Sequence, residues 1–321
     1  MTKRQRDILQ RKNTFLTTPP HFPSQTQAKF VRLGFHDCVG PDGCNGCIDL
    51  ENIDNAGLLL PMGRLCEMCG YYSSVLTRAD CWALAALTAA EYSQPDPANQ
   101  VAFELFHVGR PDCADGNLLG HAASDAAAFP SPHLTSDELV NFFAAEFSFS
   151  PDETVAIMGA HTLGTLSNAR SGFNGAWVHG ERVFDNEFYL FLVDNQDDTL
   201  PSSAFAQENV NNGNGKYSWT HVGGVAGSRP EIMLNADMSL VRNFAGHFVG
   251  DSTVGQVDCI LSDDGSGTAV CPFAQTLSKV TEYSRDNALW LNEFHSAYVK
   301  MLTNGHDTSH CSPGVLCDVS L

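Results

Sequence analysis

Arg32 and His36 are the first residues whose types and spacing suggest chemistry. On a helix they occupy positions i and i+4, so both side chains project from one face roughly 6 Å apart, with Phe35 beside them. A permanent cation next to a base that titrates near neutral pH suits the splitting of a small molecule into charged fragments. The alternative is a surface arginine and a solvated histidine, because the pattern is short.

His161 is a second candidate, because it follows an apolar segment with helical character, Val155–Ala160. Such a setting suits an axial heme ligand, although a lone histidine there is also typical of a protein core. Asp237 has apolar neighbours in Leu234–Asp237 and is suited to hold the other ring nitrogen of a ligating histidine. Its alternative is an exposed aspartate in a loop.

Helix signals dominate the segments that must position these residues. Thr77 begins a sequence like a capping box before the apolar residues 81–87, and Thr135 begins another helix. The residues expected on the core face of that second helix are Leu139, Phe142 and Phe143.

Two further helices are expected, and strands are few and short. Ser150 as N-cap with Pro151 at the first helical position predicts a helix that runs to His161. Apolar residues at helical spacing predict another helix over residues 287–302. The Asn- and Gly-rich segment 210–228 is interpreted as a long surface excursion. The expected fold class is mainly α.

The 11 cysteines are too dilute for a disulfide scaffold, but they are clustered. Cys38 lies near two CxxC pairs, 44/47 and 66/69, which together could form a tetrahedral zinc site. Disulfides formed in an oxidising compartment explain these clusters together with the local pairs 259/271 and 311/317, and leave one odd thiol. Reduced thiols are the third alternative.

Length, charge and hydropathy exclude several classes of protein. The 321 residues predict two domains or one large bilobed domain. The net charge of -19 repels phosphate backbones, so no nucleic-acid partner is expected. No apolar run approaches the ~20 residues that span a bilayer. The basic N-terminus lacks the apolar stretch of a signal peptide, and a trimmed targeting segment stays open.

Taken together, these segments resemble the plant-type (non-animal) heme peroxidase superfamily over nearly the whole chain. Arg32, Phe35 and His36 resemble its distal helix, and Met158–Gly164 resembles its proximal-histidine motif. Segment 54–58 resembles the distal-asparagine segment, and 79–81 with 109–112 resembles the structural Asp–Arg pairing of the family.

The resemblance implies a fold of two helical lobes with heme b between them, a distal lobe 1–128 and a proximal lobe 129–321 whose last helix packs across both. His161 would bind the iron, and Asp237 would accept a hydrogen bond from it and stabilise high-valent iron. His36 would move the proton of iron-bound peroxide, Asn55 would orient His36, and Arg32 would stabilise the developing negative charge.

Other motifs bear on the electron donor. Trp177 falls where ascorbate and cytochrome c peroxidases have a proximal tryptophan, which would stack on the ligand and donate its indole N–H to Asp237. Arg170 falls where ascorbate peroxidases have an arginine for the anionic donor, whereas Ser24 stands at the offset of their lysine. Pro130 resembles the proline-containing segment near the access channel.

Features of the secreted branches are also present, so the sequence resembles a hybrid. Phe35 replaces the distal tryptophan of the intracellular branch. The expected cation ligands are Asp37, Gly43 and Asn45 in a segment like the distal calcium loop, and Thr162 and Asp185 at a proximal cation site. An extracellular location is expected, with an intracellular one left open.

Three functions follow from the resemblance. The first is a peroxidase that reduces hydrogen peroxide with a small phenolic or ascorbate-like donor. The second uses a cationic redox protein such as cytochrome c, steered by the charge of -19 and connected through Trp177. The third is a non-catalytic heme-binding extracellular protein, although a carrier needs only the iron ligand.

Overall fold

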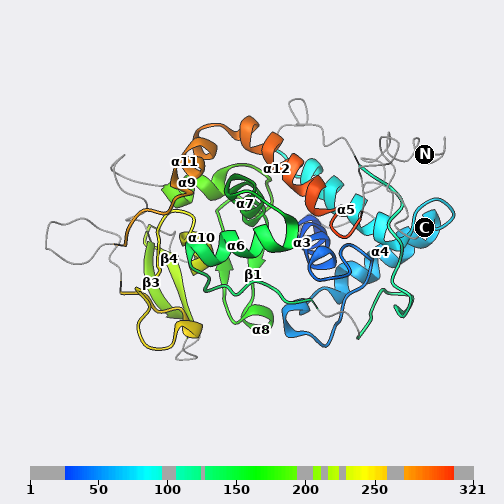
Figure 1. Cartoon of the computed structure of the whole chain (residues 1–321), viewed down its shortest axis with the longest axis horizontal. Helices are drawn as coiled ribbons and strands as arrows, with labels where there is room; N and C mark the ends of the chain where they lie inside the picture. Colours follow the sequence, from blue (N-terminus) through cyan, green and yellow to red (C-terminus); the bar gives the residue numbers. More distant parts are fainter. Residues whose placement is uncertain are drawn as a thin grey trace, which may run out of the picture. The chain divides into compact units, whose positions relative to one another are not determined.

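The structure is a computed structural model that describes most of the chain (Figure 1), namely residues 26–95, 106–123, 127–193, 205–210, 216–223, 229–258 and 271–306. These residues form many helices and a few short strands, which confirms the mainly α fold class. None of the helices in these ranges has both the length and the apolar character needed to cross a membrane.

The chain divides into two compact units, Met1–Phe129 with His295–Leu321, and Pro130–Phe294. The first boundary lies beside the lobe boundary expected after residue 128. Helix α12 (Asn287–Met301), expected over 287–302, begins in the second unit and ends in the first. Residues 295 onward therefore belong with the N-terminal unit rather than with the C-terminal one.

The first unit is built around helix α5 (Arg78–Tyr92), whose residues 79–91 are all buried. Thr77 caps this helix by accepting the amide N–H of Asp80 at 3.0 Å, as the sequence predicts. The other elements of the unit are α3 (Thr26–Cys38), the 3-10 helix η1 (Ile53–Asn55) and α4 (Leu59–Tyr72).

Helix α3, which carries Arg32 and His36, packs closely on α5. A side-chain carbon at Gly34 would lie 2.6 Å from Cβ of Ala86 and 2.9 Å from the hydroxyl oxygen of Tyr298. Glycine is therefore required at this position, because any side chain would push the two helices apart.

A pair of buried charges supports the same unit. The guanidinium of Arg110 donates to the carboxylate of Asp80 at 2.8 Å, and both side chains are almost completely buried. Arg110 also donates from Nε to the carbonyl oxygen of Leu302 at 2.8 Å. The Asp–Arg pairing implied by the sequence is present, and it reaches the end of α12.

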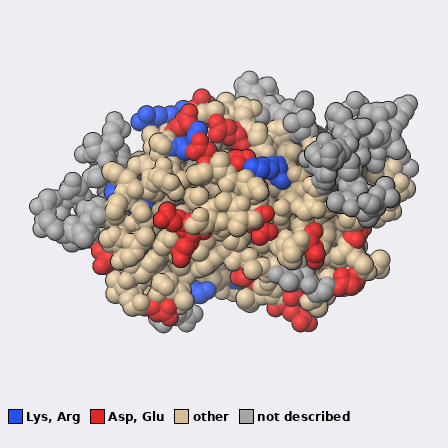
Figure 2. Space-filling view, viewed as in Figure 1, with Lys and Arg blue, Asp and Glu red and all other residues tan. Residues whose placement is uncertain are grey.

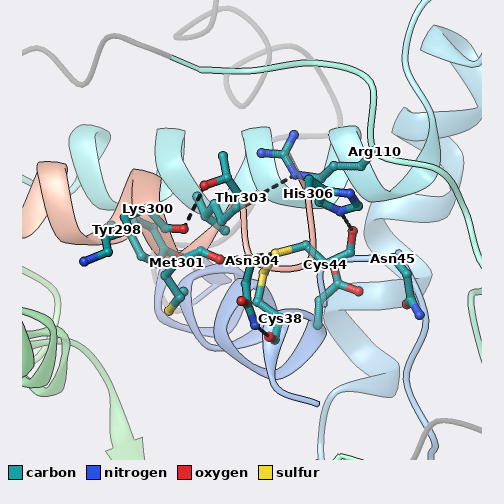
Figure 3. Close-up of a disulfide and its surroundings, with 12 residues drawn as sticks. Cys38, Cys44, Asn45, Arg110, Tyr298, Lys300, Met301, Thr303, Asn304 and His306 are labelled. Carbon is teal, nitrogen blue, oxygen red and sulfur yellow. Dashed lines mark hydrogen bonds between the residues drawn. A yellow bond between two sulfur atoms is a disulfide. The ribbon is translucent and has the colours of Figure 1, made fainter. Parts of the chain in front are cut away.

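The C-terminal end of α3 is held by the segment that follows α12 (Figure 3). Cys38 forms a disulfide with Cys44, and the Asn304 side-chain amide donates to the carbonyl oxygen of Cys38 at 3.0 Å. The amide N–H of Cys44 donates to the carbonyl oxygen of Asn304 at 3.2 Å. His306 Nε2 lies 2.9 Å from the carbonyl oxygen of Cys44. Residues far apart in sequence thus hold the loop after the distal helix.

In the second unit, two helices begin at complete capping boxes, as predicted. Thr135 and Glu138 cap α6 (Ser136–Phe147), and Ser150 and Glu153 cap α7 (Pro151–Met158). Leu139 and Phe143 are buried, whereas Phe142 is only partly so. The chain continues from α7 as a 3-10 helix, η2 (Gly159–Thr162), so His161 lies on a tightened last turn.

The remaining elements of the second unit are short or pack around α7. They are α8 (Asn168–Ser171), α9 (Glu187–Val193), α10 (Asn235–Met238), the 3-10 helix η3 (Ser252–Val254), α11 (Leu277–Arg285) and the first part of α12. Strands β1 (Thr165–Leu166) and β2 (Gly175–Ala176) form a small antiparallel pair.

A three-stranded antiparallel sheet corrects one expectation. It has the order β3 (Phe205–Val210), β4 (Lys216–His221) and β5 (Ile232–Met233). Part of the segment expected as a surface excursion is therefore the central strand β4, on which Trp219 is only 2% exposed. Residues 211–215 and 224–228 of that segment lie outside the described residues.

The cysteines pair as disulfides, and the two CxxC motifs are separated. Besides Cys38–Cys44, the pairs are Cys47–Cys113 and Cys69–Cys81, and Cys271 is also disulfide-bonded. Cys66 is free, and the described residues contain no cluster of three His, Cys, Asp or Glu suited to a metal ion. The zinc interpretation is therefore wrong for the described motifs. Cys259, Cys311 and Cys317 lie outside the described residues.

Candidate active site

The distal candidates come together in the first unit. His36 Nδ1 lies 2.7 Å from Oδ1 of Asn55, and Asn55 donates from Nδ2 to the carbonyl oxygen of Asp49 at 2.8 Å. Because its amide group donates to Asp49, Asn55 presents its carbonyl oxygen to His36. The proton of the neutral His36 ring is therefore on Nδ1, and Nε2 carries the basic lone pair.

Arg32 is positioned by the same 3-10 turn. Its guanidinium donates to the carbonyl oxygens of Asp54 at 2.6 Å and Ala56 at 3.0 Å. These two carbonyls flank Asn55, so one short segment orients both the cation and the partner of His36. Arg32 and His36 are therefore both held by hydrogen bonds to residues 54–56.

The environment keeps His36 neutral. Its side chain is buried, and this burial together with the nearby Arg32 cation lowers the pKa of His36 to about 3, although the hydrogen bond that His36 donates to Asn55 acts in the opposite direction. At physiological pH the ring is thus an uncharged base. Among the described residues no group donates to or accepts from its Nε2 atom.

Two phenylalanines enclose the His36 ring. Phe35 lies edge-on to it with ring centroids 5.5 Å apart, and Phe129 lies against it at 4.3 Å. Sequence analysis did not identify Phe129, which is more than ninety positions from His36 in the chain and carries no motif. The one feature of the sequence that could have pointed to Phe129 is its position directly before Pro130, the residue expected near the access channel.

The proximal candidates come together in the second unit. His161 Nδ1 lies 2.7 Å from Oδ1 of Asp237, whose side chain is fully buried. The other carboxylate oxygen of Asp237 accepts the amide N–H of Leu234 at 2.7 Å, so it caps α10. Asp237 is therefore a buried helix-capping residue rather than an exposed aspartate in a loop.

Trp177 stacks on the ring of His161, with centroids 4.0 Å apart and an angle of 4° between the planes. The expected hydrogen bond from its indole N–H to Asp237 is absent between these two described residues. Within the described residues, Oδ1 of Asp237 faces His161 instead, and Oδ2 accepts the Leu234 amide N–H. The stacking expectation agrees with the structure, and the hydrogen-bond expectation is wrong.

A buried network that sequence analysis missed holds α10 in place. Trp219 on β4 donates from Nε1 to Oδ1 of Asn235 at 2.9 Å. Asn235 in turn donates from Nδ2 to the carbonyl oxygen of Gly255 at 2.9 Å. Because Asn235 is the first residue of α10, this network positions the helix that presents Asp237.

The residues expected to bind the electron donor or a cation make fewer side-chain contacts with one another. Arg170 is exposed on α8, and Pro130 begins the second unit. Ser24 lies outside the described residues. In the distal segment, Asp37 and Asn45 each accept the amide N–H of Cys47, at 3.1 and 3.0 Å, and Gly43 has a positive φ of 61°.

At the proximal cation candidate, the structure brings the expected pair together. The Thr162 hydroxyl donates to the carboxylate of Asp185 at 3.4 Å, and that carboxylate also accepts the amide N–H of Glu187 at 3.0 Å. Burial raises the pKa of Asp185, against the effect of these two hydrogen bonds. A cation at either place stays a prediction.

Comparison with known proteins defines the class of protein. The sequence profile of the family described as Peroxidase matches residues 16–249. The chain therefore belongs to the peroxidase family, within the plant-type superfamily whose motifs it carries, and is a peroxidase enzyme.

Individual relatives are similar at moderate identity. A putative heme-binding peroxidase of Yarrowia lipolytica is 28% identical over 74% of this chain and 73% of its own length. A protein of the same description from Candida albicans is 24% identical over 93% of this chain and 87% of its own length. Cytosolic L-ascorbate peroxidase 2 of Oryza sativa subsp. japonica is 32% identical over 46% of this chain and 53% of its own length, so the match spans about half of that enzyme.

Proposed function

We propose that this peroxidase uses heme to reduce hydrogen peroxide and takes electrons, one at a time, from a small organic donor. The observation that carries the proposal is the shared design of two histidines. His36 and His161 each have Nδ1 held 2.7 Å from a buried side-chain oxygen, and neither Nε2 makes a hydrogen bond to a described residue. One ring is thus prepared as a base and the other as an electron-rich ligand.

His161 fits a heme iron. Its side chain is 35% exposed, whereas Asp237 behind it is fully buried and Trp177 and Leu163 beside it are nearly so. An imidazole nitrogen that is open within an apolar setting is a typical axial donor for heme iron. Heme b, when bound by His161 Nε2, supplies the redox-active iron that takes up the oxidising equivalents of peroxide. Five of the relatives bear the description "putative heme-binding peroxidase".

On the distal side, His36 moves a proton. Its Nε2 atom accepts the proton of hydrogen peroxide and then gives it to the oxygen that leaves as water. Asn55 keeps the ring proton on Nδ1 throughout, so the reactive nitrogen is always the same one. Arg32, held on two carbonyl oxygens, offsets the negative charge on the departing oxygen.

On the proximal side, Asp237 accepts the N–H of His161 and so increases the electron density at Nε2. Its own position is maintained by the Leu234 amide, which occupies the second carboxylate oxygen. Trp177 covers one face of the His161 ring and restricts how far that ring can rotate.

Reconstitution with hemin tests this proposal. The wild-type protein should show a Soret band, which His161→Ala should shift or abolish. His36→Leu should keep the band and lose rapid reaction with peroxide. A wild-type protein with no band sensitive to residue 161 would contradict the heme assignment, and a normal peroxide rate in His36→Leu would contradict the proton-transfer role.

For the donor, we propose a small phenolic or ascorbate-like molecule. Arg170 supports an anionic donor, because it is exposed and has no ion-pair partner among the described residues. Relatives described as ascorbate peroxidases are consistent with this choice. Turnover with ascorbate, a neutral phenol and Mn²⁺ should be compared for wild type and Arg170→Gln. Selective loss with ascorbate would support the anionic donor, and equal rates would contradict it.

A cationic redox protein is a second candidate for the donor. It is favoured by the net charge of -19 and by the stacking of Trp177 on the iron-ligating ring. Figure 2 shows acidic side chains scattered over the face drawn, with few lysines or arginines among them. Turnover with cytochrome c should then fall steeply as salt is added and should need Trp177. Turnover with a neutral phenol should be nearly independent of salt.

Two further expectations are retained as proposals. The first is a cation, Ca²⁺ or another ion, at Asp37, Gly43 and Asn45 or at Thr162 and Asp185. The second is secretion, which is supported by the disulfides, because such bonds persist in oxidising compartments. Metal analysis of the purified protein and fractionation of the source cells test these two proposals.

A further inference from the structure

We propose that Tyr283 is a redox-active tyrosine that stores one oxidising equivalent within the second unit, with Glu293 as the acceptor of its proton. This inference rests on the proposed peroxidase function, because hydrogen peroxide is the source of the oxidising equivalent. It assigns a role to an aromatic cluster that the peroxide chemistry does not otherwise use.

The cluster leads from His161 into the packing of α9, α11 and α12. Phe188 lies edge-on to His161 with centroids 6.0 Å apart, and Tyr189 follows at 5.3 Å from Phe188. The ring centroid of Tyr189 lies 5.2 Å from that of Tyr283 and 5.6 Å from that of Trp290. Consecutive ring contacts therefore connect the proximal histidine with three aromatic side chains that can lose an electron.

Only one of these three side chains has a base beside its acidic hydrogen. The Tyr189 hydroxyl donates to the carbonyl oxygen of Val155 at 2.7 Å, and the Trp290 indole N–H donates to that of Ala156 at 3.0 Å. Amide carbonyls do not retain a transferred proton. The hydroxyl of Tyr283 instead donates to the carboxylate of Glu293.

Proton transfer decides where the electron deficit comes to rest. Burial and the hydrogen bond to Glu293 raise the pKa of Tyr283 above its usual range, so the phenol is protonated at neutral pH. An oxidised phenol is a strong acid, and its energy falls when a base takes the proton. Tyr189 and Trp290 lack that base, so Tyr283 is the favoured final site.

The surrounding charges are compatible with this role. Lys279 lies over the Tyr283 ring at 5.3 Å, and a cation there opposes loss of an electron. However, Lys279 is paired with three carboxylates, of Glu282 at 2.7 Å and of Asp152 and Glu293 at 3.6 Å. The net charge next to the ring is thus negative, which favours the oxidised state.

The proposed step is balanced. One electron passes from Tyr283 through the ring contacts toward the heme that His161 would hold, after hydrogen peroxide has oxidised that group; the phenolic O–H bond breaks, and Glu293 gains the proton. The product is a neutral tyrosyl radical next to a neutral carboxylic acid. When one electron returns from a donor, Tyr283 recovers the proton from Glu293, and the cluster is reset.

The exposure of the cluster indicates what the step is for. Tyr283 itself is 0% exposed, so small donors do not touch its ring, whereas the Glu293 side chain is 37% exposed. The tyrosine therefore acts as a temporary store when donors are scarce, and draws the oxidising equivalent away from the heme site next to His161.

Electron paramagnetic resonance of the heme-loaded enzyme, frozen after mixing with peroxide and no donor, tests this inference. Wild type should give a tyrosyl radical signal that disappears in Tyr283→Phe. Tyr298→Phe is the matched control, because Tyr298 is also buried but donates to the backbone carbonyl of Val31 at 3.1 Å. Loss of the signal in the control alone, or its persistence in Tyr283→Phe, would overturn the assignment.

Glu293→Gln separates proton transfer from packing. The glutamine keeps a hydrogen-bond acceptor of similar shape but cannot keep the proton, so the tyrosyl signal should be lost while the unfolding midpoint changes little. An unchanged signal would overturn the role of Glu293. Peroxide consumption by Tyr283→Phe should equal that of wild type. If wild type does not react with peroxide, the proposed function fails; if it reacts without a radical at Tyr283, only this inference fails.

Discussion

At the scale of single residues, the rate of peroxide reaction depends on the base at His36. Replacement by leucine removes the only proton acceptor assigned to the peroxide, so the second-order rate constant should fall by roughly a hundredfold or more. Stopped-flow absorbance of the heme-loaded protein measures this. His247→Leu, at a partly exposed histidine paired with Asp258, is the control and should react normally. A small effect at His36 would mean that another group moves the proton.

The pH dependence of the same reaction has a predictable sign. His36 acts as a neutral base, and its pKa of about 3 means that the rate should be level down to about pH 4 and fall below it. Arg32→Leu removes one of the two causes that lower this pKa, so in this variant the fall should begin at higher pH. Stopped-flow mixing with a brief pH jump avoids acid unfolding. Identical midpoints in both proteins would contradict the coupling of Arg32 to His36.

A site residue could be predicted from the sequence when the residues it contacts lie close to it in the chain. Arg32 and His36 were found because helical spacing alone places them on one face. Phe129 was not found, since its contact with His36 depends on how the chain returns. The hydrogen bond expected from Trp177 to Asp237 is absent between these two described residues, because the orientation of a stacked indole depends on tertiary packing, which no sequence pattern displays.

At the scale of elements, helix α10 is too short to be stable without help from its neighbours. Asn235 connects it to Trp219 and to the Gly255 carbonyl, both inside the protein. Asn235→Ala should lower the free energy of unfolding by about 1–3 kcal/mol, because a buried indole N–H loses its acceptor. Urea denaturation measures this. Asn292→Ala, at an exposed site on α12, should change little, and equal losses would contradict the argument.

The helices were easier to predict than the sheet for a physical reason. Capping boxes at Thr135 and Ser150 act within four residues, so the sequence displays them completely. Strand β4 is stabilised by its neighbours β3 and β5 and by burial of Trp219. Its flanking Asn and Gly residues favoured a loop interpretation, and the partner strands were not visible in the local pattern.

At the scale of the whole molecule, the disulfides should contribute unequally to stability. Cys47–Cys113 joins residues 66 positions apart and Cys38–Cys44 only 6. In the chain-entropy account, the longer loop constrains the unfolded chain more, by about 2 kcal/mol. Alanine pairs at each disulfide, compared by guanidinium denaturation, should show the larger loss at 47 and 113. A larger loss at 38 and 44 would indicate that local anchoring of α3 matters more.

The tie between the loop after α3 and residues 302–306 has a consequence for biosynthesis. Asn304 and His306 complete the packing around Cys38 and Cys44, and Arg110 binds the carbonyl oxygen of Leu302. While the ribosome is still translating the second unit, these contacts do not exist. The segment that carries α3 therefore stays incompletely packed until residues 302–306 have been synthesised, and during this interval it is a candidate for binding by a chaperone.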